Sequence, residues 1–291
     1  MAGVDGGVQL GLDALDPAFV SRPLVRVTPA RYTTWVDCPR RYRLTYVDRP
    51  PPPRSGARAT STLGAVVHLA LRALYALPDP RRTPDAAAAL VDRNWSSEGF
   101  RDGDQATEYR VRAREWVADY VAGPGAEAEP VAVEKWVTVP TPRVIAEGRV
   151  DRIDRRPEAA DAADGLVVVD YKTGRRPTAD DARGSAALAL YALAARHTLR
   201  RPCTRVELHH LPSGEVAAAT HDEASLRGHL DRIEDAATAA ADAAAALPSG
   251  DRDVLFPARP APRCGTCDVR RHCPEGRAAA PESEPWAFLD R

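Results

Sequence analysis

The sequence predicts an α/β fold, in which a helical N-terminal part precedes a central sheet and an irregular, cysteine-bearing segment follows it. Apolar residues recur at helical spacing in three segments between residues 62 and 122. Apolar and polar residues alternate from Val131 to Val139 and from Val144 to Asp154, as they do in strands with one buried face. Three of the five cysteines lie beyond residue 251, in a proline-rich stretch.

The N-terminal part begins with a stretch rich in Gly and Asp, residues 1–27, which we expect to form a flexible arm. Residues 28–47 mix aromatic residues and arginines around Cys38, and the prolines between Arg49 and Arg54 favour an extended linker. Helices are then predicted at 62–77, 84–98 and 105–122, where Pro78 and Gly123-Pro124-Gly125 end the first and the last.

The central part follows a strand-rich pattern. Pro140-Thr141-Pro142 would join the first two strands as a hairpin, and the apolar run Leu166–Val169, after a polar turn at 157–165, is typical of a central strand. A helix at 185–199, a hairpin of 205–211 and 215–220, and a helix at 222–247 complete the pattern. We expect one domain over 28–277, made of a helical part (28–125), an α/β core (129–247) and a cysteine segment (251–277), with a tail at 278–291.

Charge and hydropathy set limits on function. The net charge is −1, so binding to DNA would need a local basic groove rather than an overall basic surface. No apolar run is long enough to span a bilayer, and residues 1–9 lack the pattern of a secretory signal. No Gly-x-x-x-x-Gly-Lys-Ser/Thr phosphate loop occurs. We therefore expect a cytoplasmic protein with no membrane partner and no ATPase of its own.

Acidic residues on two predicted strands indicate a metal site. Asp151 lies on the strand 144–154, and Asp170 ends the apolar strand that follows. If these strands are neighbours, the two carboxylates offer the oxygen ligands that Mg²⁺ prefers. Lys172 lies two residues beyond Asp170, hence on the same face, where a cation can activate water and offset charge on a phosphate. The alternative is a surface pair of acids beside a stray lysine. Lys172 is, however, one of only two lysines, with Lys135, among 40 Lys and Arg.

These residues stand in motifs that resemble the RecB/AddB-type branch of the PD-(D/E)XK nuclease superfamily. The chain has Gly64-Ala65-Val66-Val67-His68, Gly148-Arg149-Val150-Asp151-Arg152-Ile153-Asp154 and Asp170-Tyr171-Lys172-Thr173-Gly174. The resemblance covers about residues 28–277, and the Asp-Tyr-Lys-Thr-Gly motif is its most specific part. It implies a restriction-endonuclease-like core, with a central mixed sheet flanked by helices.

The resemblance also implies roles for individual residues. Asp151, Asp170, His68 and the carbonyl of Tyr171 would bind Mg²⁺ or Mn²⁺, and Lys172 would act on the water and the scissile phosphate. Glu134, on the preceding strand, would support these ligands. Taken alone, His68 would be interpreted as a packed helix histidine, and its place in this set of motifs reverses that interpretation.

The chain departs from the branch at one helix. Tyr191 is present, but Ala187 stands four residues earlier where the branch has Gln, and Ser185 stands where an acid is common. Because that Gln is associated with holding the site and the DNA strand, its loss puts full activity in doubt.

The spacing of the cysteines indicates a metal rather than disulfides. Cys264-x-x-Cys267 and Cys273, together with the distant Cys38, match the iron–sulfur nucleases of the same branch, which implies a [4Fe–4S] cluster that ties the two ends of the domain together. Zinc is the alternative, with His272 near enough to replace a cysteine. Cys203 is expected in the core.

The resulting hypothesis is a Mg²⁺- or Mn²⁺-dependent DNA exonuclease that acts on single-stranded ends in repair or recombination, alone or with a helicase partner. The alternative is a DNA-binding or scaffold module that keeps the fold but cuts poorly. The aromatic and basic residues around Cys38 could stack bases and hold phosphates. Alternatively, the aromatics pack against the cluster and the arginines are solvated, and both could hold at once. These residues are Tyr32, Trp35, Arg40, Arg41, Tyr42 and Arg43.

Overall fold

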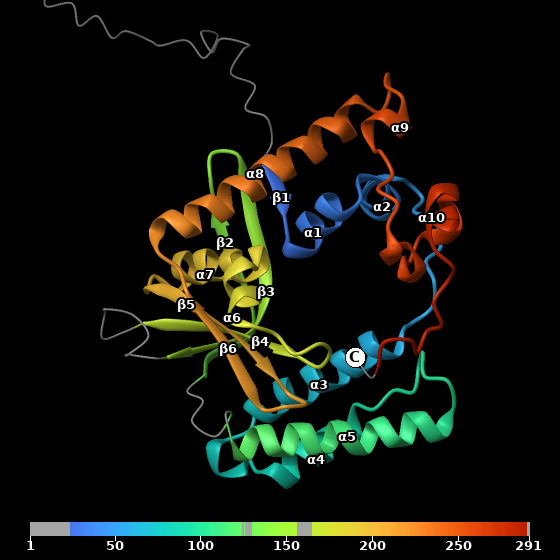
Figure 1. Cartoon of the computed structure of the whole chain (residues 1–291). Coiled ribbons are helices and arrows are strands. Elements are labelled where there is room, and N and C mark those ends of the chain that lie inside the picture. Colours follow the sequence, from blue (N-terminus) through green and yellow to red (C-terminus); the bar gives the residue numbers. More distant parts are fainter. Residues whose placement is uncertain (1–23, 124, 126–129, 156–164, 290–291) are drawn as a thin grey trace, which may run out of the picture.

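The computed structural model describes residues 24–123, 125, 130–155 and 165–289. These residues form a six-stranded mixed sheet with helices packed on both faces, which confirms the predicted α/β fold (Figure 1). The strands are β1 (Val25–Val27), β2 (Pro130–Pro140), β3 (Val144–Arg155), β4 (Leu166–Lys172), β5 (Cys203–His210) and β6 (Glu215–Thr220).

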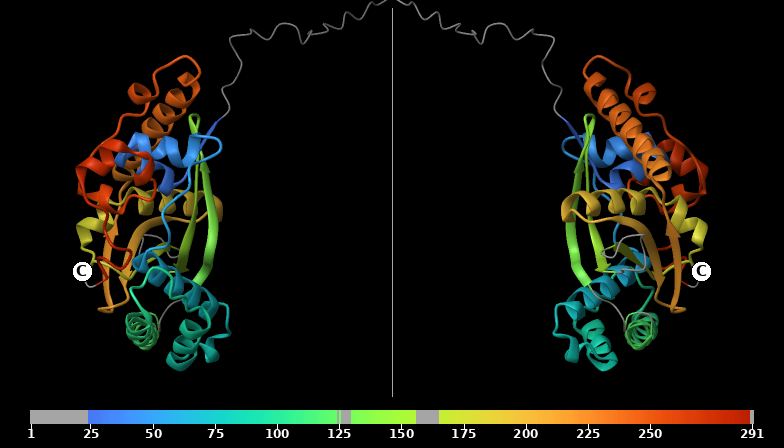
Figure 2. Two further views of the ribbon diagram at one scale, coloured as in Figure 1. Left: turned by 90° about the vertical axis from the view of Figure 1, so that its right-hand side faces the viewer. Right: turned by 90° about the vertical axis from the view of Figure 1, so that its left-hand side faces the viewer.

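Strand β3 organises the sheet. β2 pairs antiparallel along one edge of β3 over nearly its whole length. The other edge is shared, because β1 pairs parallel with the first residues of β3 and β4 pairs antiparallel with the last four. β5 then runs parallel to β4, and β6 runs antiparallel to β5. β2 and β3 (green) consequently lie at a margin of the molecule in both views of Figure 2.

The apolar run in β4 is explained by burial on both faces. Leu166 and Val168 pack into the core beneath α7 (Ala186–Leu199) and α8 (Glu223–Ala246). Val167 and Val169 face a second core, formed by α3 (Ala59–Tyr75), α4 (Pro84–Arg93) and α5 (Gly103–Ala122). A strand with two buried faces has no polar side to alternate with, so its sequence is continuously apolar.

The two ends of the chain meet away from the sheet. α1 (Pro29–Asp37) and α2 (Pro39–Tyr42), followed by a π-helical turn (Arg43–Val47), lie beside the C-terminal segment in both views of Figure 2. That segment contains α9 (Arg252–Leu255), two short 3₁₀ turns (Pro262–Thr266 and Arg270–His272) and α10 (Pro274–Ala279). The Arg40 amide donates to the Pro257 carbonyl at 3.3 Å.

The structure differs from the predicted boundaries at a few places. Val25–Val27, which the sequence placed in a flexible arm, pair with β3, and residues 1–23 lie outside the described part. The helix predicted at 84–98 ends at Arg93, where Asn94 caps it. A further helix, α6 (Ala179–Gly184), precedes α7. The tail contacts the rest of the chain, since the Ala59 amide donates to the Pro285 carbonyl at 3.0 Å.

Among the described residues, no helix is both long and apolar enough to cross a membrane.

Candidate metal centre

The predicted acidic residues lie where β3 and β4 separate. The last paired residues at this end are Arg152 of β3 and Val169 of β4. Asp151 and Asp170 come directly beyond this pair, so neither aspartate has a partner in the β3–β4 pairing. The opening leaves room for groups from other elements to approach the two carboxylates.

Side-chain alternation in β3 is interrupted at the same point. Val150 and Ile153 both pack into the core beneath α7, although they are three residues apart. Two consecutive residues, Asp151 and Arg152, therefore lie between them without reaching that core. Such irregularities are common next to active sites, because they re-aim a side chain that strict alternation would direct elsewhere.

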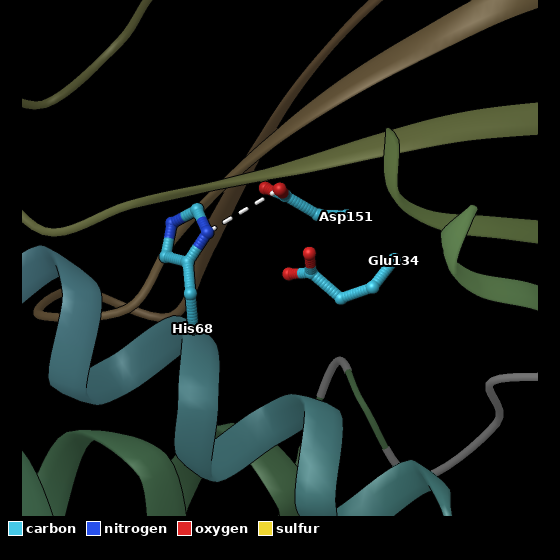
Figure 3. Close-up of side chains that lie close together, drawn as sticks. All are labelled: His68, Glu134 and Asp151. Carbon is cyan, nitrogen blue, oxygen red and sulfur yellow. Dashed lines mark ion pairs between the residues drawn. The ribbon is translucent and has the colours of Figure 1, made fainter. Parts of the chain in front are cut away.

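His68 approaches Asp151 from helix α3 (Figure 3). Its Nδ1 lies 3.3 Å from Asp151 Oδ1, and its Nε2 lies 3.2 Å from the carbonyl oxygen of Tyr171. Burial opposes the charged imidazole, but the hydrogen bond to Asp151 and the charges of Asp151 and Asp170 outweigh it and raise the pKa of His68. Gly64, one turn earlier on α3, faces Thr173, whose Oγ1 would lie 3.5 Å from an added Cβ, an ordinary contact distance.

Glu134 completes a tight set of ligand atoms. One atom each from His68, Glu134 and Asp151 lie within 4.8 Å of one another, the one such set of three found among the described residues. Figure 3 shows the three side chains pointing toward a common point. Glu134 has a left-handed backbone, with φ 49°, and its Oε2 lies 2.8 Å from Arg149 Nε. The sequence suggested a supporting acid here, but neither the backbone conformation nor the arginine partner.

Asp170 and Lys172 form an ion pair next to this set. Burial raises the pKa of the Asp170 carboxyl, Lys172 opposes that rise, and the charge of Asp151 adds to it. Asp170 lies near enough to His68 to help raise its pKa, but it is outside the group of mutually close ligand atoms. The centre thus holds three carboxylates, one imidazole and one lysine.

The backbone of Tyr171 is fixed on both sides of its α-carbon. Its N–H donates to Asp151 Oδ2 at 3.0 Å, while its carbonyl lies against His68. Its ring enters the interior, where Arg152 Nη1 donates to the hydroxyls of Tyr171, Tyr120 and Tyr75 at 2.9, 3.0 and 2.6 Å. Arg152 Nε lies 2.8 Å from Asp154, and both side chains are fully buried. The motif contains Arg152 and Asp154, but their role beneath the site is visible only in three dimensions.

Tyr191 lies over β3 from helix α7. A Cβ on Gly148 would lie 2.5 Å from Tyr191 Cε1, so this position of the strand has room only for glycine. Burial, together with the charges of Asp170 and Asp151, raises the pKa of Tyr191, as expected for a phenol beside carboxylates. Ala187 lies one turn earlier on α7 and offers no polar group.

The four cysteines of the second motif line one cavity. Cys38, Cys264, Cys267 and Cys273 border a space of about 210 Å³ between α2 and the C-terminal segment. No three of their sulfur atoms lie within 4.8 Å of one another. His272 does not border the cavity, and its Nε2 lies 3.0 Å from the Pro53 carbonyl oxygen. Cys203 is fully buried in the core, as expected, and burial raises its pKa to about 12.

The aromatic residues around Cys38 pack in the interior instead of forming an open surface. Trp35 makes edge-to-face contacts with Tyr42 and Phe256, at centroid distances of 5.4 and 5.9 Å. Arg40 is buried, donates to the Phe256 carbonyl at 3.1 Å and pairs with Asp253 at 2.7 Å. Trp35 and Tyr42 therefore pack where the N-terminal helices meet the C-terminal segment, whereas Arg40 and Arg43 are buried and not solvated as the packing alternative expected.

Comparisons with known proteins agree with this geometry. The family model of the PD-(D/E)XK nuclease superfamily matches residues 26–274. Among solved structures, the chain is similar to the crystal structure of a candidate exonuclease from Eubacterium rectale, with a TM-score of 0.51 and 11% sequence identity. That alignment covers 91% of this chain and 94% of the other, and it shows a shared fold. No match was found among curated protein sequences.

Proposed function

The chain belongs to the PD-(D/E)XK nuclease superfamily, and we propose on that basis that it is a deoxyribonuclease dependent on Mg²⁺ or Mn²⁺. The observation that carries the proposal is the convergence of His68, Glu134 and Asp151 at the point where β3 and β4 separate, beside the Asp170–Lys172 pair. Carboxylate oxygens with a single imidazole suit a divalent cation of this kind.

The residues of the centre have distinct tasks in the proposal. His68, Asp151, Asp170 and the Tyr171 carbonyl would bind the cation, which would polarise the phosphate and lower the pKa of a bound water. Glu134, which pairs with Arg149, would support these ligands. Lys172, which pairs with Asp170 and has 44% of its side chain exposed, would act on the attacking water and on a phosphate oxygen. Its positive charge offsets the charge that develops on phosphorus oxygens during hydrolysis. Tyr191 closes the centre on the side of α7.

The substrate that we propose is DNA with single-stranded ends, which the enzyme shortens during repair or recombination. The resemblance to RecB/AddB-type nucleases supports this choice. Since the sequence contains no phosphate loop for ATP, a helicase partner would supply unwound strands where the substrate begins as duplex.

We further propose that the cysteine cavity holds a [4Fe–4S] cluster. Sulfur ligands on one tetrahedral Zn²⁺ lie about 3.8 Å apart, because each Zn–S bond is about 2.3 Å long. No three of these sulfurs lie within 4.8 Å of one another, and the cavity between them has a volume of about 210 Å³, which supports a larger group over a single zinc ion. The cluster would join α2 to the C-terminal segment.

Ala187 supports a second candidate, a DNA-binding module that cuts poorly. Position 187 lies one turn before Tyr191 and lacks the amide that the resembling branch uses to hold the strand. In that case wild-type protein would bind DNA without metal-dependent cleavage, and Asp170→Ala would leave binding intact.

Cleavage of end-labelled single-stranded DNA tests the proposal. Anaerobically purified protein is compared in Mg²⁺, Mn²⁺ and EDTA, with Lys172→Ala beside it. Lys135→Ala is a matched control, because Lys135 is the second of two lysines and is exposed on β2. We expect metal-dependent shortening by wild type and Lys135→Ala, and a loss of at least about a hundredfold in Lys172→Ala. Equal inactivity of all three proteins would favour the binding module.

A further inference from the structure

One aromatic residue near the candidate metal centre is largely exposed. Trp136 of β2 is 60% exposed, whereas Phe288, the other aromatic among the exposed large apolar residues, is 37% exposed. Within the described part of the chain, the Trp136 indole takes part in no aromatic or cation–π contact. A tryptophan in water at a sheet margin leaves a large apolar surface uncovered, and such surfaces often bind a ligand.

The position of Trp136 relates it to the metal centre. Trp136 faces Arg149 across the β2–β3 ladder, and cross-strand partners share one face of a sheet. The next pair, Val137 and Gly148, is buried, with Val137 in the core beneath α7, so Trp136 and Arg149 point to the opposite face. That is the face from which His68 enters on α3.

Arg149 links the tryptophan to the ligand set. Its Nε lies 2.8 Å from Glu134 Oε2, and 54% of its side chain is exposed. Glu134, two residues before Trp136 along β2, belongs to the set with His68 and Asp151. An exposed aromatic ring, an exposed guanidinium and the set of His68, Glu134 and Asp151 therefore lie next to one another along the β2–β3 pair.

We propose that Trp136 and Arg149 form a binding subsite for single-stranded DNA, in which the indole stacks on an unpaired base and the guanidinium binds the phosphate beside it. Aromatic rings interleaved with cations bind single strands in this way, since every base has a face to stack and every link a charge to neutralise. A base inside a duplex is already stacked on both sides. The subsite therefore selects single strands over duplex DNA at the entrance to the centre. This inference rests on the proposed nuclease function.

Binding measurements can test the subsite separately from cleavage. A labelled oligothymidylate and a blunt duplex are titrated, in Mn²⁺, with protein carrying Lys172→Ala so that the strand stays intact. Trp136→Ala and Trp136→Phe are added to this background. Val216→Ala is the control, because Val216 is exposed on β6 at the other side of the sheet. We expect Trp136→Ala to weaken single-strand binding about tenfold, Trp136→Phe to restore most of it, and duplex binding to change less than about twofold.

Three results would overturn the subsite. The first is unchanged oligothymidylate binding by Trp136→Ala, and the second is an equal loss of duplex binding. The third is a wild-type protein that is a dimer and a Trp136→Ala variant that is a monomer, because this surface would then bind a second copy of the chain. Cleavage by the otherwise wild-type protein, measured in parallel, separates the two proposals. Trp136-dependent binding without any cleavage would refute the nuclease and retain the subsite, whereas cleavage with Trp136-independent binding would do the reverse.

Discussion

Tyr171 connects the candidate metal centre with the protein interior. Its backbone contacts Asp151 and His68, whereas its ring hydroxyl accepts a hydrogen bond from the buried Arg152. The position of the carbonyl proposed as a cation ligand is thus determined by a side-chain network below the sheet. Arg152 also forms an ion pair with Asp154, so one arginine contacts a buried carboxylate and donates to three tyrosine hydroxyls.

Replacing this arginine should destabilise the fold and disturb the centre. Arg152→Met would leave Asp154 as an uncompensated buried charge, which costs about 3–5 kcal/mol. In a domain of this size we expect the Tm to fall by about 10 °C, measured by circular dichroism. Arg155→Met, at an exposed position of the same strand, should change the Tm by less than about 2 °C.

A double variant distinguishes the effect of the unpaired Asp154 charge from the effect of lost side-chain packing at Arg152. Adding Asp154→Leu to Arg152→Met removes the unpaired carboxylate and should recover part of the lost stability. If the single variant melts like wild type, Arg152 does not support the centre in the way described.

At the scale of elements, two buried histidines lie where the N-terminal part of α8 meets the rest of the domain. His221 precedes the N-terminus of α8, and His229 lies two turns into it, with ring centroids 5.4 Å apart at nearly a right angle. His221 Nε2 and His229 Nδ1 have no hydrogen-bond partner within the described part of the chain. Burial lowers the pKa of both histidines. The charges of His229 and Arg183 lower the pKa of His221 further, and the charge of Arg232 lowers that of His229.

These lowered pKa values predict that the protein loses stability in mild acid. Below pH 6.5 the unfolded chain takes up protons on these histidines while the folded chain does not. Their contribution is complete above pH 6.5 and decreases as the pH falls, by at most about 1.4 kcal/mol per pH unit for each histidine. Urea unfolding at a series of pH values should show a shallower dependence for His221→Asn/His229→Asn than for wild type. An unchanged slope would contradict this assignment.

Long elements could be predicted from the sequence because their periodicity extends over many residues. The helices at 62–77, 105–122, 185–199 and 222–247 and the strands at 131–139 and 144–154 match α3, α5, α7, α8, β2 and β3 to within a few residues. β1 was missed because three residues are too few for a pattern, and only their pairing with β3 makes them a strand.

Local irregularities could not be predicted in the same way. The change of face at Asp151 and the left-handed backbone of Glu134 bring ligand atoms together, yet both interrupt the alternation that identified the strands. The partner of Arg149 and the neighbour of Trp136 depend on the register between β2 and β3, which one strand alone does not encode. The motifs therefore identified the acids and the lysine, while the subsite beside them required the structure.

At the scale of the whole molecule, an N-terminal segment and the C-terminal segment of the chain meet at the cysteine cavity. Cys38 follows α1, whereas the other three cysteines lie more than 220 residues later, so the α/β core is contained within the loop between them. Ion pairs also join the two segments: Arg40 pairs with Asp253 at 2.7 Å and Arg41 with Asp268 at 2.9 Å. A group bound by all four thiolates would restrict the unfolded chain strongly, because the loop it closes is long.

Removing one cysteine should therefore loosen the ends more than the core. In Cys38→Ser we expect the loss of iron and sulfide, of about four atoms each per chain in wild type, and faster amide exchange in α1, α2 and residues 251–289. The strands β3 to β5 should keep their protection, because their two cores do not involve the cavity. Cys203→Ala is the matched control: this fifth cysteine lies in the sheet core, so the variant should keep its iron. Stoichiometric zinc without sulfide in wild type would replace the cluster by a single ion, and uniform loss of protection in Cys38→Ser would show that the core depends on the closure.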